Sequence, residues 1–310
     1  MKKLPYLIIC LCLAVLLCGC NGSVPAAQIA ATTLPVYHFA DILCEGTPLT
    51  VTRLVTEEVS CLHDYSLNVR QVKAAEAAEV IVMSGAGLEE FLDNMLAGAD
   101  IIDASEGIAL ICPVEDHDHE HDHEHDHEHE RENEQEEHSH EGHHHDQDPH
   151  IWLSPVNAMV MAQNICDGLT ERYPEYEAVF ADNLKLLLDQ LEALQQYGED
   201  TLREIDSREI ITFHDGFAYF ADSFGLTILE TVEEESGSEA SAKELIHLID
   251  MIHEHDVQAI FTETFGSTSA ASIISRETGA TCASLDMAMA GDSYFDAMYH
   301  NIDTLKEALQ

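Results

Sequence analysis

Short apolar runs alternate with helix-like segments in both halves of this chain, and this alternation restricts the possible folds more than any other feature. The expected strands are apolar or alternate in polarity and lie at 29–33, 49–55, 80–83, 209–213, 226–231, 257–263 and 281–285. The expected helices begin at Pro35 and span 69–79, 87–97, 216–224, 241–254, 268–278 and 293–309. Such alternation favours parallel sheets that are covered by helices. The sequence therefore predicts an α/β fold with two lobes of (βα)n units.

A long helical region separates the two halves. One helix is expected at 156–171, and a second at 175–205 carries leucines at helical spacing after Pro174. About 30 helical residues would span roughly 45 Å. This helix could act as a rigid connector between the lobes or lie flat on one of them, and periodicity does not separate these alternatives. The expected organisation is a signal peptide (1–20), an N-terminal metal-binding lobe (21–173), a linking helix (174–205) and a C-terminal metal-binding lobe (206–310).

The N-terminus has the pattern of an export signal. Lys2 and Lys3 precede an apolar run at 4–17, which is shorter than the roughly 20 residues that a membrane span needs. The run ends at Leu17-Cys18-Gly19-Cys20, which resembles a lipobox. We expect Cys20 to become a lipidated first residue, so that the protein is extracytoplasmic and anchored to the cell membrane. The alternatives are a plain secretory signal or an uncleaved anchor.

Charge and cysteine usage exclude some classes of function. The formal net charge of −46 argues against nucleic acid as a partner, because phosphate binding needs Lys and Arg. The remaining cysteines form no CxxC pair, which argues against a cysteine zinc finger. Buried single thiols are expected, although disulfides remain possible outside the cell. These cysteines are Cys44, Cys61, Cys112, Cys166 and Cys282.

Residues 115–148 form a low-complexity segment in which histidine alternates with Asp and Glu. The segment has almost no apolar side chains to bury, so we expect it to be disordered without metal. Imidazole and carboxylate groups in many equivalent arrangements predict several weak, exchangeable metal ions. A solvated run without function is the alternative, and a concentrator and a sensor are both possible uses. The histidines are His117, His119, His121, His123, His125, His127, His129, His138, His140, His143, His144 and His145.

Four further residues lie where a parallel-sheet fold presents ligand sites. His63, His214 and Asp286 follow expected strands, and His150 precedes Trp152 at the end of the low-complexity segment. Because ligand sites in such folds lie at the carboxyl ends of strands, we expect these residues to meet in a cleft between the lobes. Three imidazoles and one carboxylate form a four-coordinate set that suits zinc.

Several other polar residues have a weaker connection with such a site. Glu263 ends an expected strand and could orient a ligand histidine, although a surface or helix-capping role is equally possible. The histidines that we expect outside any metal site are His38, His247, His253, His255 and His300.

Six segments of the chain match motifs of a known family. They are ATTLPVYHFADIL at 31–43, CLHDYSLNVRQV at 61–72, GLEEFL at 87–92, DPHIWLSP at 148–155, TFHDGFAYF at 212–220 and LDMAMAGDSYFDAMYHN at 285–301. The chain resembles the zinc/manganese-type (cluster A-I) periplasmic metal-binding lipoproteins of ABC transporters, and DPHIWLSP resembles the most specific family motif. An acidic, histidine-rich insertion before this motif is a feature of the zinc-binding subgroup.

The resemblance implies a function and a set of ligands. It implies capture of Zn(II) by His63, His150, His214 and Asp286, and delivery to an ABC permease and its ATPase by a monomer that is not an enzyme. Manganese members tend to carry Glu at the position of His214, so zinc is expected over manganese. A manganese-binding counterpart, an adhesin and a zinc buffer without transport remain alternatives. A zinc enzyme is disfavoured because no HExxH motif lies outside the low-complexity segment at 115–148 and no obvious general base is paired with the site.

The sequence also departs from the family pattern. Leu62 replaces a proline before the first histidine, and Ser66, Leu67 and Val69 replace a glutamate and prolines after it. We therefore expect the loop around His63 to be less rigid than in the family. Ser154 replaces the second aspartate of the DPHxWLDP motif. The resemblance leaves open whether Asp286, another carboxylate or water is the fourth ligand.

Overall fold

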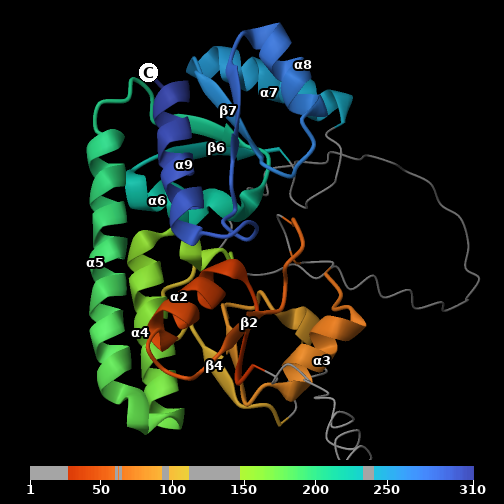
Figure 1. Ribbon diagram of the computed structural model, residues 1–310. Coiled ribbons are helices and arrows are strands. Elements are labelled where there is room, and N and C mark those ends of the chain that lie inside the picture. Colours follow the sequence, from red (N-terminus) through yellow and green to blue (C-terminus); the bar gives the residue numbers. More distant parts are fainter. Residues whose placement is uncertain (1–26, 60–61, 63–64, 93–97, 112–146, 233–240) are drawn as a thin grey trace, which may run out of the picture.

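Two four-stranded parallel sheets, one in each lobe, form the framework of the protein in this computed structural model (Figure 1). The structure describes residues 27–59, 62, 65–92, 98–111, 147–232 and 241–310. The first sheet has the order β2-β1-β3-β4 and the second has the order β6-β5-β7-β8. Every strand pair is parallel, and β1 and β5 lie inside their sheets, so each lobe is doubly wound. The predicted α/β fold with two lobes is confirmed.

All seven predicted strands are present within two residues of their expected limits, and the structure adds an eighth. The first sheet contains β1 (Ile29–Ala31), β2 (Val51–Arg53), β3 (Val80–Met83) and β4 (Ile101–Asp103). The second contains β5 (Glu209–Thr212), β6 (Thr227–Thr231), β7 (Ala259–Glu263) and β8 (Thr281–Leu285). The additional strand, β4, has three residues and pairs only with β3, so its apolar pattern is too short to identify it in the sequence.

The helices follow the predicted order. The α-helices are α2 (Leu34–Cys44), α3 (Val69–Ala77), α4 (Pro155–Arg172), α5 (Glu177–Thr201), α6 (Ala218–Phe224), α7 (Ala242–His255), α8 (Ser269–Thr278) and α9 (Tyr294–Ala308). Short 3-10 helices lie at η1 (Glu90–Leu92), η2 (Ile151–Leu153), η3 (Pro174–Tyr176) and η4 (Asp215–Phe217). The helix predicted at 87–97 differs: its described part contains only η1, and residues 93–97 lie outside the described part. Gly85, Ala86 and Gly87 have positive φ angles of 79°, 55° and 85°, which are incompatible with a right-handed helix at these residues.

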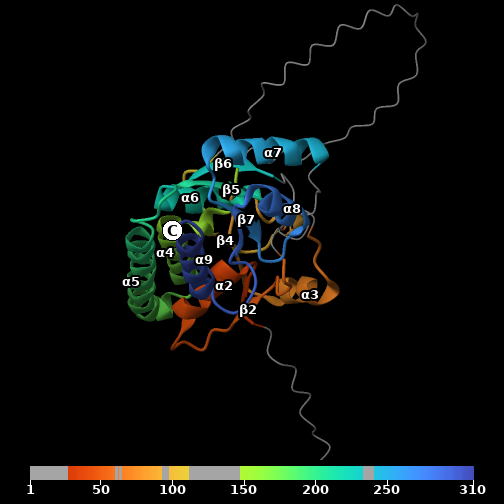
Figure 2. The same cartoon turned by 90° about the horizontal axis from the view of Figure 1, so that it is seen from above.

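The long helix α5 connects the two lobes, which is the first of the two predicted alternatives. It packs against α2 and α4 in the first half of the chain and against α6 and α9 in the second half. Figures 1 and 2 show α5 at one edge of the molecule, with α3 and α8 at the opposite side. Gly198 allows the close approach to α6, because an added Cβ would lie 2.2 Å from Cε1 of Phe224.

One apolar core extends through both lobes. It includes fully buried side chains from the first half, from α5 and from the second half, among them Phe39, Trp152, Phe180, Phe261 and Tyr294. A smaller core lies between the second sheet and helices α7 and α8. Because close-packed interiors resist deformation, this shared core predicts that the lobes move little relative to each other.

Several predicted features lie partly or wholly outside the described residues. These are the signal peptide, the lipobox with Cys20, the histidines of the 115–148 segment, Cys61 and Cys112. None of the helices in the described part is long and apolar enough to span a membrane. Cys44 and Cys166 are buried free thiols, as expected. The expectation of a buried thiol was wrong for Cys282, which is exposed because it lies near the start of the edge strand β8.

A buried carboxylate ties together the carboxyl ends of β1 and β3. Glu89 accepts hydrogen bonds from Thr32 Oγ1 (2.7 Å), Ser84 N (2.7 Å) and Gly85 N (3.0 Å). Burial raises the pKa of Glu89 to about 7, although these hydrogen bonds act to lower it. Its carboxyl group is therefore a determinant of how stability depends on pH.

We expect the contribution of Glu89 to the free energy of unfolding to be present below about pH 4.5 and to be lost as the pH rises through about 7. The sign follows because the pKa is higher in the folded state, which binds more protons than the unfolded state in this window. The shift from 4.5 to about 7 corresponds to about 3 kcal/mol. The free energy of unfolding, measured with urea on the metal-free protein, should therefore fall more between pH 5 and pH 8 in the wild type than in Glu89→Ala. The exposed neighbour variant Glu90→Ala should behave like the wild type, and identical pH dependence in all three proteins would contradict the prediction.

Candidate metal centre

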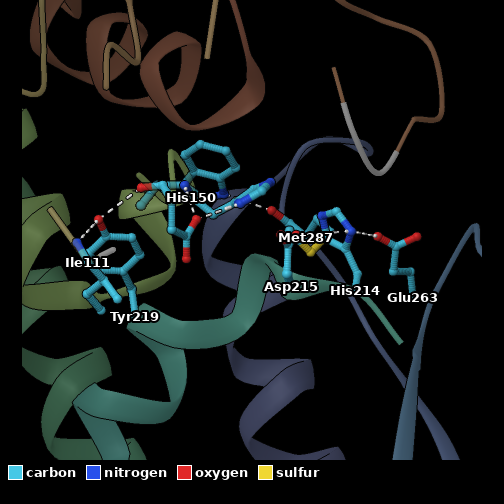
Figure 3. A network of polar contacts seen from close by, with 9 residues as sticks. Ile111, His150, His214, Asp215, Tyr219, Glu263 and Met287 are labelled. Atoms are coloured by element: carbon cyan, nitrogen blue, oxygen red, sulfur yellow. Dashed lines mark hydrogen bonds and ion pairs between the residues drawn. The ribbon is translucent and has the colours of Figure 1, made fainter. Parts of the chain in front are cut away.

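His150 lies in a buried position that fixes the orientation of its ring. Its side chain is 1% exposed, and it directly precedes η2 at the start of the α4 segment. Asp148 Oδ1 accepts from the backbone N–H of His150 and lies 2.8 Å from its Nδ1 (Figure 3). The Asp148 backbone is held in turn, because Asp148 N donates to Ile111 O (2.9 Å) and Tyr219 Oη donates to Asp148 O (2.9 Å).

This contact makes Nε2 the available ligand atom of His150. A neutral imidazole that donates from Nδ1 to a carboxylate keeps a lone pair on Nε2. Nε2 is fully buried and has no hydrogen-bond partner among the residues that the structure describes. A buried acceptor without a partner destabilises a protein, unless another group or a metal ion binds it. The environment of His150 therefore fits a metal ligand.

His214 contributes a second buried imidazole from the other lobe. It lies between β5 and η4 and is 1% exposed. Its ring centroid is 5.1 Å from that of His150, with the two ring planes at 83°. Figure 3 shows the His214 ring between His150 on one side and Glu263 on the other. Two imidazoles from residues 64 positions apart in the sequence thus meet between the lobes, as the sequence predicts for these two residues.

Two carboxylates lie next to the His214 ring. Glu263, at the end of β7 and 5% exposed, places Oε1 3.4 Å from Nδ1, and the exposed Asp215 places Oδ1 3.7 Å from the same nitrogen. Carboxylates beside Nδ1 leave Nε2 as the ring nitrogen that is available to a metal ion. Glu263 therefore lies beside Nδ1 of His214 as Asp148 lies beside Nδ1 of His150, but at 3.4 Å rather than 2.8 Å.

The close approach of the two rings requires a glycine. A Cβ at Gly216 would lie 2.5 Å from Met287 Cε and 2.9 Å from both His150 Nδ1 and His214 Cδ2. Any larger residue would push the imidazoles or Met287 aside. The His-Asp-Gly sequence at 214–216 is the signal for this constraint, and Gly216 is an addition to the residues expected from the sequence.

Asp286 directly follows β8, and its described contacts are with the turn after β8 and with α9. Its Oδ1 accepts from Ala288 N (2.7 Å), and Asp286, Asp292, Asp296 and His300 line a shallow pocket of about 360 Å³. Burial raises the pKa of the Asp286 carboxyl, while the Ala288 N–H and His300 oppose that rise. Within the described part of the chain, no three His, Cys, Asp or Glu side chains are grouped to hold one ion.

His63 lies outside the described residues, so its predicted place in the site stays a prediction. The neighbouring segments are well connected. Asn68 caps α3 in a reciprocal arrangement with Gln71, and Gln71 Nε2 donates to Leu54 O (2.9 Å) and to Glu57 Oε2 (2.8 Å). Tyr65 Oη also donates to Glu57 (2.7 Å). Side-chain hydrogen bonds thus hold the described parts of this loop, where the family motif has prolines.

Five other histidines lie in the described part of the chain. His247, His253 and His255 are exposed on α7, and His300 is exposed on α9. His38 accepts from Tyr294 N at Nδ1 (3.2 Å), and burial lowers its pKa. The contacts that the structure gives these histidines do not involve His150 or His214, and His300 lines the pocket beside Asp286. That all five lie outside the metal site stays a prediction.

Two residues near the site have roles that the motif comparison did not assign. Trp152 is fully buried, donates from Nε1 to Met287 O (2.7 Å) and accepts from Tyr294 Oη at its carbonyl (2.8 Å). These bonds join the DPH motif in the first lobe to the segment after β8 in the second. Ser154 accepts from Asn157 N (3.3 Å) and so caps α4, a role that aspartate can also fill.

The protein has two parallel-sheet lobes that share a long helix, and buried imidazoles from both lobes meet between them. These features define a two-lobed solute-binding protein for a metal ion. The sequence matches the family described as ZnuA, zinc-uptake complex component A, periplasmic, over residues 29–308. The chain therefore belongs to this family, whose members are metal-binding solute-binding proteins of ABC uptake systems and not enzymes.

Relatives with different metals in their names are similar to this chain. It is 24% identical to the manganese-binding lipoprotein MntA of Halalkalibacterium halodurans, covering 100% of this chain and 99% of that protein. It is 27% identical to the zinc-binding lipoprotein AdcA of Streptococcus pneumoniae, covering 99% of this chain but 61% of that longer protein. A crystal structure of ZnuA is 27% identical, with a TM-score of 0.74, and the match covers 92% of this chain and 100% of that one.

Proposed function

We propose that this protein captures Zn(II) outside the cytoplasm and delivers it to an ABC importer. The observation that carries the proposal is the pair of buried imidazoles, His150 and His214, each with a carboxylate beside its Nδ1. Carboxylate–histidine pairs of this kind orient metal-ligating nitrogens in proteins. In the proposed site His63 and Asp286 complete a four-coordinate set with these two residues, and Asp148 and Glu263 hold the rings.

Zinc is the proposed cargo because of the chemistry of the donor atoms. Imidazole nitrogen suits zinc, whereas manganese prefers carboxylate and other oxygen ligands. A set of three imidazoles and one carboxylate therefore favours zinc. The zinc-binding relative and the histidine-rich segment at 115–148 support the same choice. Manganese is the second candidate, because the manganese-binding relative matches this chain along its entire length.

Delivery requires that the ion leave a site enclosed by two lobes. The shared core and α5 restrict the relative movement of the lobes. We therefore propose that docking on a membrane permease, which works with an ATPase, distorts the ligand geometry and releases the ion. In this proposal a lipid on Cys20 keeps the monomeric protein near the permease, and the 115–148 segment gathers ions close to the cleft.

Zinc is expected to raise the melting temperature far more than manganese does. A ligand at about 1,000 times its dissociation constant adds about 4 kcal/mol to the free energy of unfolding. At roughly 2 °C per kcal/mol for a chain of this size, zinc should raise the melting temperature by at least about 8 °C. Differential scanning calorimetry of the metal-free protein with each ion in turn measures the shift.

A deletion variant that lacks residues 115–146 serves as the control for this measurement. It should bind fewer zinc ions in a titration but keep one tight site and most of the thermal shift. Equal shifts with zinc and manganese would contradict the zinc assignment, and loss of the shift in the deletion variant would contradict the cleft site.

A further inference from the structure

A buried asparagine on α9 holds the backbone of Asp286 on both sides. Asn301 is 0% exposed. Its Oδ1 accepts from Asp286 N (2.7 Å), and its Nδ2 donates to Asp286 O (2.7 Å). The orientation of the amide follows from these partners, because a backbone N–H can only donate and a carbonyl can only accept. One side chain therefore satisfies both backbone groups of a single residue.

The two hydrogen bonds from Asn301 take the place of strand pairing at the point where the β7–β8 ladder ends. The β7–β8 ladder extends to the pair Glu263 and Leu285, and Thr264 N still donates to Leu285 O (2.9 Å). Asp286 is the first residue beyond the ladder, where the backbone loses its strand partner. Buried backbone groups need hydrogen-bond partners, and Asn301 supplies both of them. Both backbone groups of Asp286 therefore have partners, as those of a residue within the sheet do.

The fixed backbone in turn determines where the Asp286 carboxylate lies. Asp286 Oδ1 accepts from Ala288 N (2.7 Å), and Ala288 has a left-handed φ of 54°. Between them, the carbonyl of Met287 accepts from Trp152 Nε1. The turn uses Oδ1, and Oδ2 is not part of it. A change in the backbone of Asp286 would rotate this turn and move both carboxylate oxygens.

We propose that Asn301 is a positioning residue that sets the Asp286 carboxylate for the metal ion. This inference rests on the proposed function, in which Asp286 is a ligand. Asn301 lies 15 residues after Asp286 and contacts both of its backbone groups. Its role at the Asp286 backbone complements the contacts that Asp148 and Glu263 make with the two imidazoles.

The test measures zinc affinity by chelator competition in the full chain, so that weakly bound ions do not contribute. Asn301→Leu keeps the approximate volume and removes both hydrogen bonds, and Asn301→Ala is the second variant. We expect each to weaken tight zinc binding about 10- to 100-fold, as substitutions of residues that orient metal ligands do. Ile302→Ala is the matched control, because Ile302 is also fully buried on α9. It should lower the melting temperature without a comparable loss of affinity.

A double-mutant cycle separates positioning from general destabilisation. Asp286→Asn alone should weaken zinc binding, and adding Asn301→Leu to it should change the affinity by less than about threefold, since residues that act as a unit are not additive. If Asp286→Asn weakens binding but the effect of Asn301→Leu is absent, additive or matched by Ile302→Ala, the positioning role is refuted while the ligand assignment stands. If Asp286→Asn leaves tight binding unchanged, Asp286 is not a ligand and both ideas fail together.

Discussion

Replacing His214 by alanine is expected to weaken tight zinc binding by roughly 100-fold or more while leaving the weakly bound ions in place. Structural zinc sites contribute about 10–16 kcal/mol of binding free energy, so each of four ligands accounts for roughly 3 kcal/mol, or about 100-fold in affinity. The variant also leaves the Glu263 carboxylate buried beside an empty space where the ring had been. Zinc titration with a competing chelator measures both classes of site in one experiment.

His247→Ala is the matched control for this variant. His247 belongs to the same lobe and lies 3.9 Å from a carboxylate oxygen of Glu230, but its side chain is 66% exposed on α7. Its removal should change neither the tight affinity nor the melting temperature in zinc. An equal loss of affinity in both variants, or tight binding that survives in His214→Ala, would exclude the proposed centre between the lobes.

Local patterns in the sequence were sufficient to predict most of the fold. The run VIVM at 80–83 forms β3 over those residues, and Gly225 and Gly279 end α6 and α8 with left-handed φ angles of 65° and 80°. These features depend on residues that are close in the sequence, so periodicity and glycine placement reveal them. The strand β4 was missed because an apolar pattern of three residues is too short to identify a strand.

The candidate site was predictable only in part. The position of His214 followed from a general rule on strand ends, and that of His150 from its place before Trp152 at the end of the low-complexity segment. The structure brings the two rings together. The contact between Asp148 and His150 joins residues two positions apart, and a search for carboxylates close to candidate ligand histidines in the sequence could have found it. Glu89 and Thr32 are 57 positions apart, and Trp152 and Met287 are 135 apart. No local pattern predicts contacts at such separations, because the first depends on how strands pair within a lobe and the second on how the two lobes pack.

Trp152→Ala is expected to lower the free energy of unfolding by about 3–5 kcal/mol, as removal of a fully buried aromatic ring does. The side chain is 0% exposed, packs 5.3 Å from the His150 ring and donates to Met287 O (2.7 Å). Its loss removes apolar contact at the junction of the lobes and leaves a buried carbonyl without its donor. Because Trp152 is the only tryptophan of the chain, unfolding should be followed by circular dichroism.

Two further variants distinguish the packing of Trp152 from its connection to the metal centre. Trp152→Phe keeps most of the buried surface but leaves Met287 O without its partner, which should lower stability by about 1–3 kcal/mol. Phe180→Ala removes another fully buried ring, from α5, and should lower stability by about as much as Trp152→Ala.

Because Trp152 links the His150 segment of one lobe to the Asp286 segment of the other, both of its variants should also weaken zinc binding, whereas Phe180→Ala should not. Equal affinities in all three variants would mean that the lobes hold the ligands in place without this hydrogen bond.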